Sequence, residues 1–203
     1  MKLVINKLEA AEHQLREAIR LWFTEGDPVA VHSLVCSAHQ IIHDLNFQQG
    51  WRDLLYDTLV IKDEFRRKWI RLIKNPYNFL KHGDWDADGT VELDTELTES
   101  FILFSLLGFE LLGRQHNETE EAYILYFALH RPSLLTEKGR KTFLGHLSAE
   151  AVQHVTELGK SGFFRAYTAL RRTHTQAEPV DRLHLTAIPR RFMAASDPVV
   201  TIK

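Results

Sequence analysis

The side chains best suited to chemistry lie around residues 71–82. Asn78 and His82 are four positions apart, so on a helix they share one face and the Asn78 amide could orient the imidazole. An imidazole placed in this way can give or take a proton near neutral pH. Three cations lie close by in the sequence, namely Arg71, Lys74 and Lys81. These residues are the first candidates for a functional site.

The turn that follows carries carboxylates at alternate positions, Asp84, Asp86 and Asp88, and then Gly89. Oxygen ligands two residues apart followed by a glycine match the first half of an EF-hand calcium loop. The second half departs from that pattern, because Thr95 stands where the loop would close with a bidentate glutamate. A turn in which short carboxylates accept hydrogen bonds from loop amides explains the same residues. Both interpretations, a divalent metal site and an Asx-rich turn, stay open.

His82 also has an interpretation that involves no function. At the end of a helix its side chain could cap that helix and bond to the acidic turn. The nearby Asp84 would then favour the protonated imidazole.

A second set of candidate ligands lies on the second predicted helix. Its members are His32, Cys36, His39 and His43. Spacings of three and four residues place them within an arc of about 60°, beside the apolar arc rather than inside it. Amphipathic side chains are common at such an edge of a core. All four span about 16 Å, too far for one ion, so a metal could take only an adjacent pair, such as His39 with His43, and a remote ligand such as His82 or Asp84.

The segment Tyr77-Asn78-Phe79-Leu80-Lys81-His82 resembles the signature of the HEPN superfamily, whose members are small helical bundles. Active members carry an arginine, a polar residue that is often asparagine, three further residues and a histidine. Asn78 and His82 match the polar residue and the histidine, and Tyr77 takes the place of the arginine. The likeness covers about residues 8–112, including the run Ala38-His39-Gln40-Ile41, and extends to uncharacterised bacterial proteins of this type.

The resemblance implies a homodimer in which arginine and histidine act on an RNA backbone at the dimer interface. Loss of the arginine removes the fixed cation that a phosphate-centred transition state needs. Lys81, Lys74 or Arg71 would have to replace it, although helical geometry directs Lys81 about 100° away from His82. The candidate catalytic residues are therefore Asn78, His82 and Lys81, and the candidate binding residues are Arg71, Lys74 and Tyr77.

Three functions follow from these patterns. The first is a non-catalytic HEPN-like protein that binds RNA, a nucleotide or a partner protein through a groove around Asn78 and His82. The second is a metal-independent endoribonuclease that uses the same two residues. The third is a helical protein that binds a divalent metal through His39, His43, His82 and the turn at residues 84–88.

Apolar residues recur every three or four positions along most of the chain, which predicts an all-α bundle of five to seven helices. The helix at residues 95–116 is almost entirely apolar in its middle and should lie at the centre. A bundle domain at residues 1–174 and an extended tail at 175–203 complete the expected organisation. The predicted helices cover about residues 3–23, 28–45, 51–74 with a continuation at 77–81, 95–116, 119–130, 148–158 and 161–173.

The 203 residues carry a formal charge of −2, so no overall charge drives binding to nucleic acid or to anionic lipid. The single cysteine, Cys36, cannot form an intramolecular disulfide, which fits a reducing compartment. Residues 1–12 carry several charges and no apolar core like that of a signal peptide, and no run approaches the roughly 20 apolar residues that a membrane span needs. We therefore expect a cytoplasmic protein with no membrane partner and no readout of DNA sequence.

Overall fold

The computed structural model describes residues 2–51, 54, 63–84, 87–145 and 147–174. Within them the regular structure is entirely helical, which confirms the predicted all-α fold. The predicted tail at 175–203 lies outside the described residues. The helices are α1 (Lys7–Phe23), α2 (Pro28–Gln48), α3 (Asp63–Lys81), α4 (Thr95–Leu111), α5 (Glu118–His130), the 3-10 turn η1 (Pro132–Leu134), α6 (Glu137–Leu144), α7 (Ala149–Thr156) and α8 (Gly159–His174).

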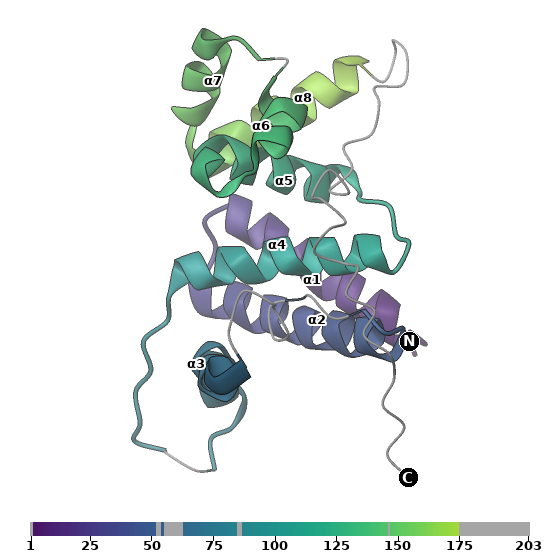
Figure 1. Ribbon diagram of the computed structural model, residues 1–203, viewed down its shortest axis with the longest axis vertical. Helices are drawn as coiled ribbons and strands as arrows, with labels where there is room; N and C mark the ends of the chain where they lie inside the picture. The colour runs from purple at the N-terminus through teal and green to yellow at the C-terminus, as the bar shows by residue number, and fades with distance from the viewer. Residues whose placement is uncertain (1, 52–53, 55–62, 85–86, 146, 175–203) are drawn as a thin grey trace.

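The helices are stacked in layers along the long axis of the molecule (Figure 1). α6, α7 and α8 lie at one end beside α5, and α3 lies at the other. α4 runs through the middle of this view and packs along α2, in agreement with its predicted central place, while α1 packs directly against α5. Among the helices that the structure describes, none combines the length and apolar character needed to cross a membrane.

Helix α1 and helix α2 form the predicted antiparallel hairpin. α1 begins later than predicted, because Asn6 and Glu9 make a capping box in which each side chain accepts a hydrogen bond from the other residue's backbone N–H. α2 begins at Pro28 as predicted, with the Asp27 carboxylate accepting a hydrogen bond from the backbone N–H of Ala30. Local capping chemistry therefore sets both helix starts.

The ends of the later helices differ in part from the predicted ones. α4 ends at Leu111 rather than at residue 116, because Gly113 adopts a left-handed φ of 80° that a helix cannot continue. α3 continues through Pro76 to Lys81, as predicted for this segment. This helix was predicted to start at residue 51. Of residues 51–62 the structure describes only 51 and 54, so most of this predicted segment lies outside the described residues. The short α6, capped by Thr136, raises the number of described α-helices to eight and was not predicted.

Aromatic side chains fill the core where α1, α5 and α8 meet. Trp22 makes edge-to-face contacts with Tyr123 and Tyr126, with ring centroids 5.0 Å away in each case. Phe163 of α8 packs edge-on against Tyr126 at 5.2 Å. Such pairs stabilise a core beyond the burial of their area, so this cluster attaches α8 to the N-terminal hairpin.

Helix α2 and helix α4 are held together by a row of buried polar contacts. His32 Nδ1 lies 2.8 Å from Thr98 Oγ1, and His39 Nδ1 lies 3.1 Å from Ser105 Oγ. Asn46 donates to the carbonyl of Gly108 at 3.0 Å. Gly108 permits this close approach, since a Cβ at that position would collide with the Ile42 side chain. We call these three contacts the α2–α4 polar seam.

The polar seam corrects the prediction for the histidines and cysteine of α2. His32, Cys36 and His39 were expected at the edge of the core, yet all three are fully buried. On α4, Thr98 Oγ1 and Ser105 Oγ each contact one nitrogen of these imidazoles, which lowers the free-energy cost of burying the rings. His43 alone is half-buried, as an edge position requires.

Candidate functional site

Arg71, Lys74, Asn78 and Lys81, four of the predicted residues, lie on one face of α3 together with Arg67, which was not predicted. Tyr77 is half-buried and lies about 100° from Asn78 around the helix. At about 100° per residue, Arg67, Arg71, Lys74, Asn78 and Lys81 fall within an arc of about 80°. Apart from Lys74, which is half-buried, their side chains are exposed. The cations from Arg67 to Lys81 span about 21 Å along the helix. We call these five residues, together with His82, the basic face of α3.

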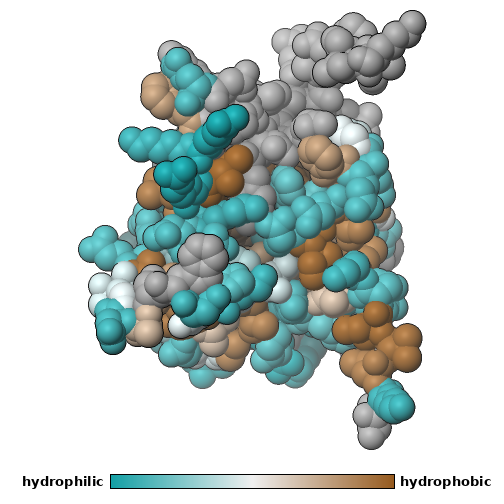
Figure 2. All heavy atoms as spheres, turned by 90° about the horizontal axis from the view of Figure 1, so that it is seen from below, coloured by the Kyte–Doolittle hydropathy of each residue, from teal (hydrophilic) through white to brown (hydrophobic). Residues whose placement is uncertain are grey.

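The opposite side of α3 explains why this face points outward. Ile73 and Pro76 are buried, and Trp69, Ile70 and Leu80 are half-buried. The helix is therefore amphipathic, and Ile73 and Pro76 of its apolar side pack against the bundle while Leu72 on the same side is exposed. Figure 2 looks at the molecule from the end where α3 lies, and hydrophilic side chains cover most of that view.

Lys74, at the centre of the basic face, is held by a chain of contacts from α2. Its Nζ donates to Gln40 Oε1 at 2.9 Å, and Gln40 Nε2 donates to Asp44 Oδ1 at 2.8 Å. His43 Nδ1 lies 3.3 Å from the same carboxylate oxygen. A cation fixed in this way loses less side-chain entropy when it meets a phosphate than a free lysine does. Gln40 was not singled out in the sequence, because its partner lies 34 residues away.

Asn78 and His82 are both exposed at the C-terminal end of α3. The backbone N–H of His82 donates to the carbonyl of Asn78 at 3.1 Å, so the two residues lie one turn apart, as the spacing predicts. Lys81 Nζ lies 5.7 Å from the ring centroid of Tyr77, within the range of a cation–π contact. The Lys81 ammonium group is therefore turned toward Tyr77.

The predicted metal ligands are not brought together within the part of the chain that the structure describes. His39 is fully buried against Ser105, whereas Asp84 and Asp88 are exposed in the segment after α3. Asp86 lies outside the described residues. No group of three or more His, Cys, Asp and Glu side chains among those described could share one ion.

A second polar cluster was not predicted, and it lies where α4 connects to α5. His116 lies between two carboxylates, with Nε2 3.6 Å from Glu110 Oε2 and Nδ1 3.7 Å from Glu120 Oε2. The three side chains are 4%, 9% and 1% exposed. Nearby, Arg114 pairs with Glu12 of α1. A neutral imidazole carries only one N–H, so only the imidazolium can interact favourably with both carboxylates.

The charge of His116 follows from this geometry. Burial alone would lower the pKa of the imidazole, but Glu110 and Glu120 outweigh that effect and raise the pKa to about 9. Glu120 also accepts a hydrogen bond from the backbone N–H of Asn117 in the capping box of α5. The Asn117–Glu120 spacing was the available sequence signal. We assign this cluster a structural role in fixing the α4–α5 connection.

Comparisons of the chain with protein-family models, with curated proteins and with solved structures found no match. The candidate site is therefore judged on the geometry and charge of its own residues.

Proposed function

We propose that the chain binds RNA through the basic face of α3. The observation that carries this proposal is the alignment of Arg67, Arg71, Lys74 and Lys81 on one side of a helix, with Asn78 and His82 at its end. A row of cations about 21 Å long suits several successive phosphates better than the single phosphate group of a small ligand. RNA fits the family resemblance of the Asn78–His82 pair, so we prefer it to other polyanions.

The overall charge of −2 does not oppose this function, because nucleic-acid binding depends on local charge as well as on net charge. Aligned basic residues are also common on helix faces that only meet solvent. The two cases differ in their response to salt. If about four lysines and arginines contact phosphates of a single strand, the logarithm of the binding constant should fall with the logarithm of salt concentration with a slope of about −3.

Reversing two charges on the basic face tests the proposal. We expect the R71E/K81E protein to bind a short fluorescent single-stranded RNA at least roughly tenfold more weakly than the original chain, with a salt slope shallower by about 1.4. Fluorescence anisotropy at several salt concentrations measures both quantities.

The matched control reverses two exposed cations on α6, in R140E/K141E. This protein carries the same change in net charge and should keep its affinity and salt slope. Equal losses in the two variants would show that only net charge matters. Absence of RNA binding by the original chain would reject the proposed function.

RNA cleavage is a second candidate function, and the position of Lys81 favours it. Lys81, whose ammonium group lies over the ring of Tyr77, is the cation next to His82 in the sequence. In the proposed reaction it would turn toward the RNA backbone and supply the charge that a phosphate-centred transition state needs. His82 would then act as the general acid or base on the RNA backbone.

Replacement of His82 by alanine tests cleavage separately from binding. We expect the original chain to cleave RNA in the presence of EDTA, and H82A to cleave it roughly a hundredfold more slowly, because general acid–base catalysis contributes about that much. Gel electrophoresis of labelled RNA follows the reaction, and H13A, which changes an exposed histidine of α1, is the control. If the chain binds the RNA but the RNA stays intact, the binding function is supported and the nuclease function is rejected.

A further inference from the structure

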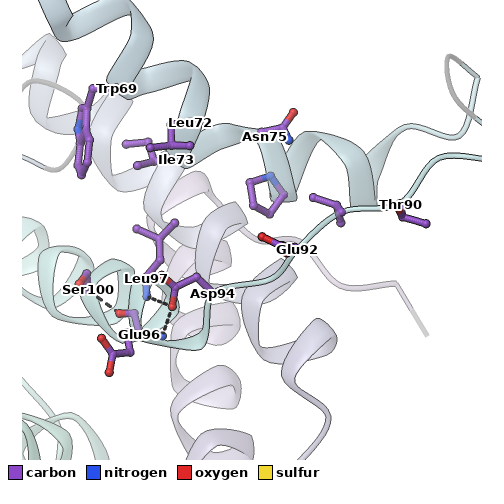
Figure 3. Close-up of a pocket in the computed structure, with 12 residues that line it drawn as sticks. Trp69, Leu72, Ile73, Asn75, Thr90, Glu92, Asp94, Glu96, Leu97 and Ser100 are labelled. Atoms are coloured by element: carbon purple, nitrogen blue, oxygen red, sulfur yellow. Dashed lines mark hydrogen bonds between the residues drawn. The ribbon is translucent and has the colours of Figure 1, made fainter.

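A pocket of about 640 Å³ lies between α3 and the start of α4 (Figure 3). α3 forms one wall, and the segment at residues 90–94 with the first turn of α4 forms the other. The volume is within the range of small-molecule sites, roughly 300–1,000 Å³. Its lining residues include none of the residues of the basic face.

Half of the twelve residues that line the pocket are apolar, and most of these come from α3. Trp69, Leu72 and Ile73 line it from α3, and Leu97 extends from α4 toward them (Figure 3). Leu72 is 65% exposed although it is one of these lining residues. An apolar group of a ligand would cover Leu72 and the half-buried Trp69 and would gain the free energy of that burial.

All of the charged residues that line the pocket are acidic. Its charged lining residues are Glu92, Asp94 and Glu96, and none of its lining residues is a lysine, arginine or histidine. Asp94 accepts hydrogen bonds from the first turn of α4, and Glu96 pairs with Arg131. Glu92 is exposed on the loop side of the pocket, opposite α3 (Figure 3), and is the carboxylate best placed to meet a ligand.

We propose that this pocket binds a small organic cation, an ammonium, guanidinium or amidinium group carried on an apolar or aromatic body. The apolar body lies against Trp69, Leu72 and Leu97, and the cation faces Glu92. The negative lining disfavours an anion of the same shape. This site is separate from the basic face of α3, so the proposal does not depend on RNA binding.

A series of three probes that share a ring but differ in charge tests the proposal. Benzamidine is positive, benzamide is neutral and benzoate is negative at pH 7. We expect benzamidine to shift the NMR signals of the Trp69 indole N–H and the Leu97 amide at millimolar concentration, benzamide to shift them less, and benzoate not at all. E92Q should weaken benzamidine binding about threefold, as expected for one partly exposed ion pair.

The control is E137Q, which removes an exposed carboxylate from α6, away from the pocket. It should leave the benzamidine titration unchanged. The proposal is overturned if no probe shifts these signals, if benzoate binds as well as benzamidine, or if E92Q and E137Q behave alike. Circular dichroism of each variant confirms that the helices are retained.

Discussion

Replacement of His116 by leucine is expected to lower the free energy of unfolding by about 3 kcal/mol at pH 7. The change removes the cation between Glu110 and Glu120, whose side chains are at most 9% exposed, and removal of one partner from a buried ion pair typically costs about 3–5 kcal/mol. Urea denaturation followed by circular dichroism measures the loss. H13L, the same substitution at an exposed histidine of α1, should change stability by less than about 0.5 kcal/mol.

Titration of His116 is also expected to lower the stability of the protein at alkaline pH. The pKa of His116 rises from about 6.5 in an unfolded chain to about 9 in the folded one. Its stabilising contribution is therefore complete below pH 6.5, declines as the pH rises, and is lost above about pH 9. The difference in stability between the original chain and H116L should shrink over this interval. A difference that stays constant from pH 6.5 to pH 10 would contradict the charged state assigned to His116.

A second variant separates charge from packing at this cluster. E120Q removes one buried carboxylate but keeps an oxygen that can accept the Asn117 backbone hydrogen bond. In the H116L protein it should restore part of the lost stability. If E120Q instead destabilises H116L further, the cluster acts through shape rather than through charge.

Acid is expected to destabilise the protein at pH values well above those at which most carboxylates are protonated. Burial lowers the pKa of His32 to about 4 and that of His39 to about 3. In the unfolded chain both titrate near 6.5, so the unfolded state binds more protons as the pH falls. The stabilising contribution of the neutral rings is complete above pH 6.5 and is lost toward the folded pKa values. Between pH 6.5 and 5 the free energy of unfolding should fall by about 3 kcal/mol.

Glutamine at position 32 or 39 tests whether the buried histidines cause this loss of stability in acid, because a glutamine side chain can bond to Thr98 or Ser105 without titrating. Each single variant, H32Q or H39Q, should show about half the original dependence of stability on pH over this interval. H13Q, at an exposed position, should retain all of it. Stability that does not change between pH 6.5 and 5 in the original chain would contradict the burial of neutral rings in the polar seam.

Local signals in the sequence were enough to predict much of the fold. Asp27 before Pro28 marks the start of α2, and Ser148 marks the start of α7, as the structure confirms. The predicted start of α1 was wrong by four residues, because Leu3 and Val4 fit the apolar period although both are exposed before the Asn6 cap. Hydrophobic spacing indicates that a helix exists, whereas capping side chains decide where it begins.

Contacts between distant residues account for what was not predicted. The rings of His32 and His39 were placed at the edge of the core, because the hydroxyl groups that permit their burial lie 66 residues away. Glu110, His116 and Glu120 are spread over the end of α4, the connecting turn and α5, so no spacing within one helix indicates that they meet. A single sequence without known partners does not reveal such pairings.

Most residues of the candidate site could be predicted from the sequence, but neither the full length of the basic face along α3 nor its contact with α2 could. The spacing of Asn78 and His82, and the cations Arg71, Lys74 and Lys81, already indicated a charged surface. Arg67, which precedes Arg71 by one turn, was overlooked. The contact between Lys74 and Gln40 depends on how α3 packs against α2, and amphipathic spacing alone does not fix that packing.

The α2–α4 polar seam also limits how the chain can misfold. Both histidine contacts join residues that are 66 positions apart, so the two helices run parallel and in a single alignment. A displacement of α4 by one turn would separate His32 from Thr98 and His39 from Ser105, at roughly 1–3 kcal/mol for each buried group left without a partner. It would also bring Phe104 or Leu112 to the place beside Ile42 that Gly108 occupies. The polar seam therefore raises the free energy of partly folded states in which α2 and α4 pack in a shifted alignment.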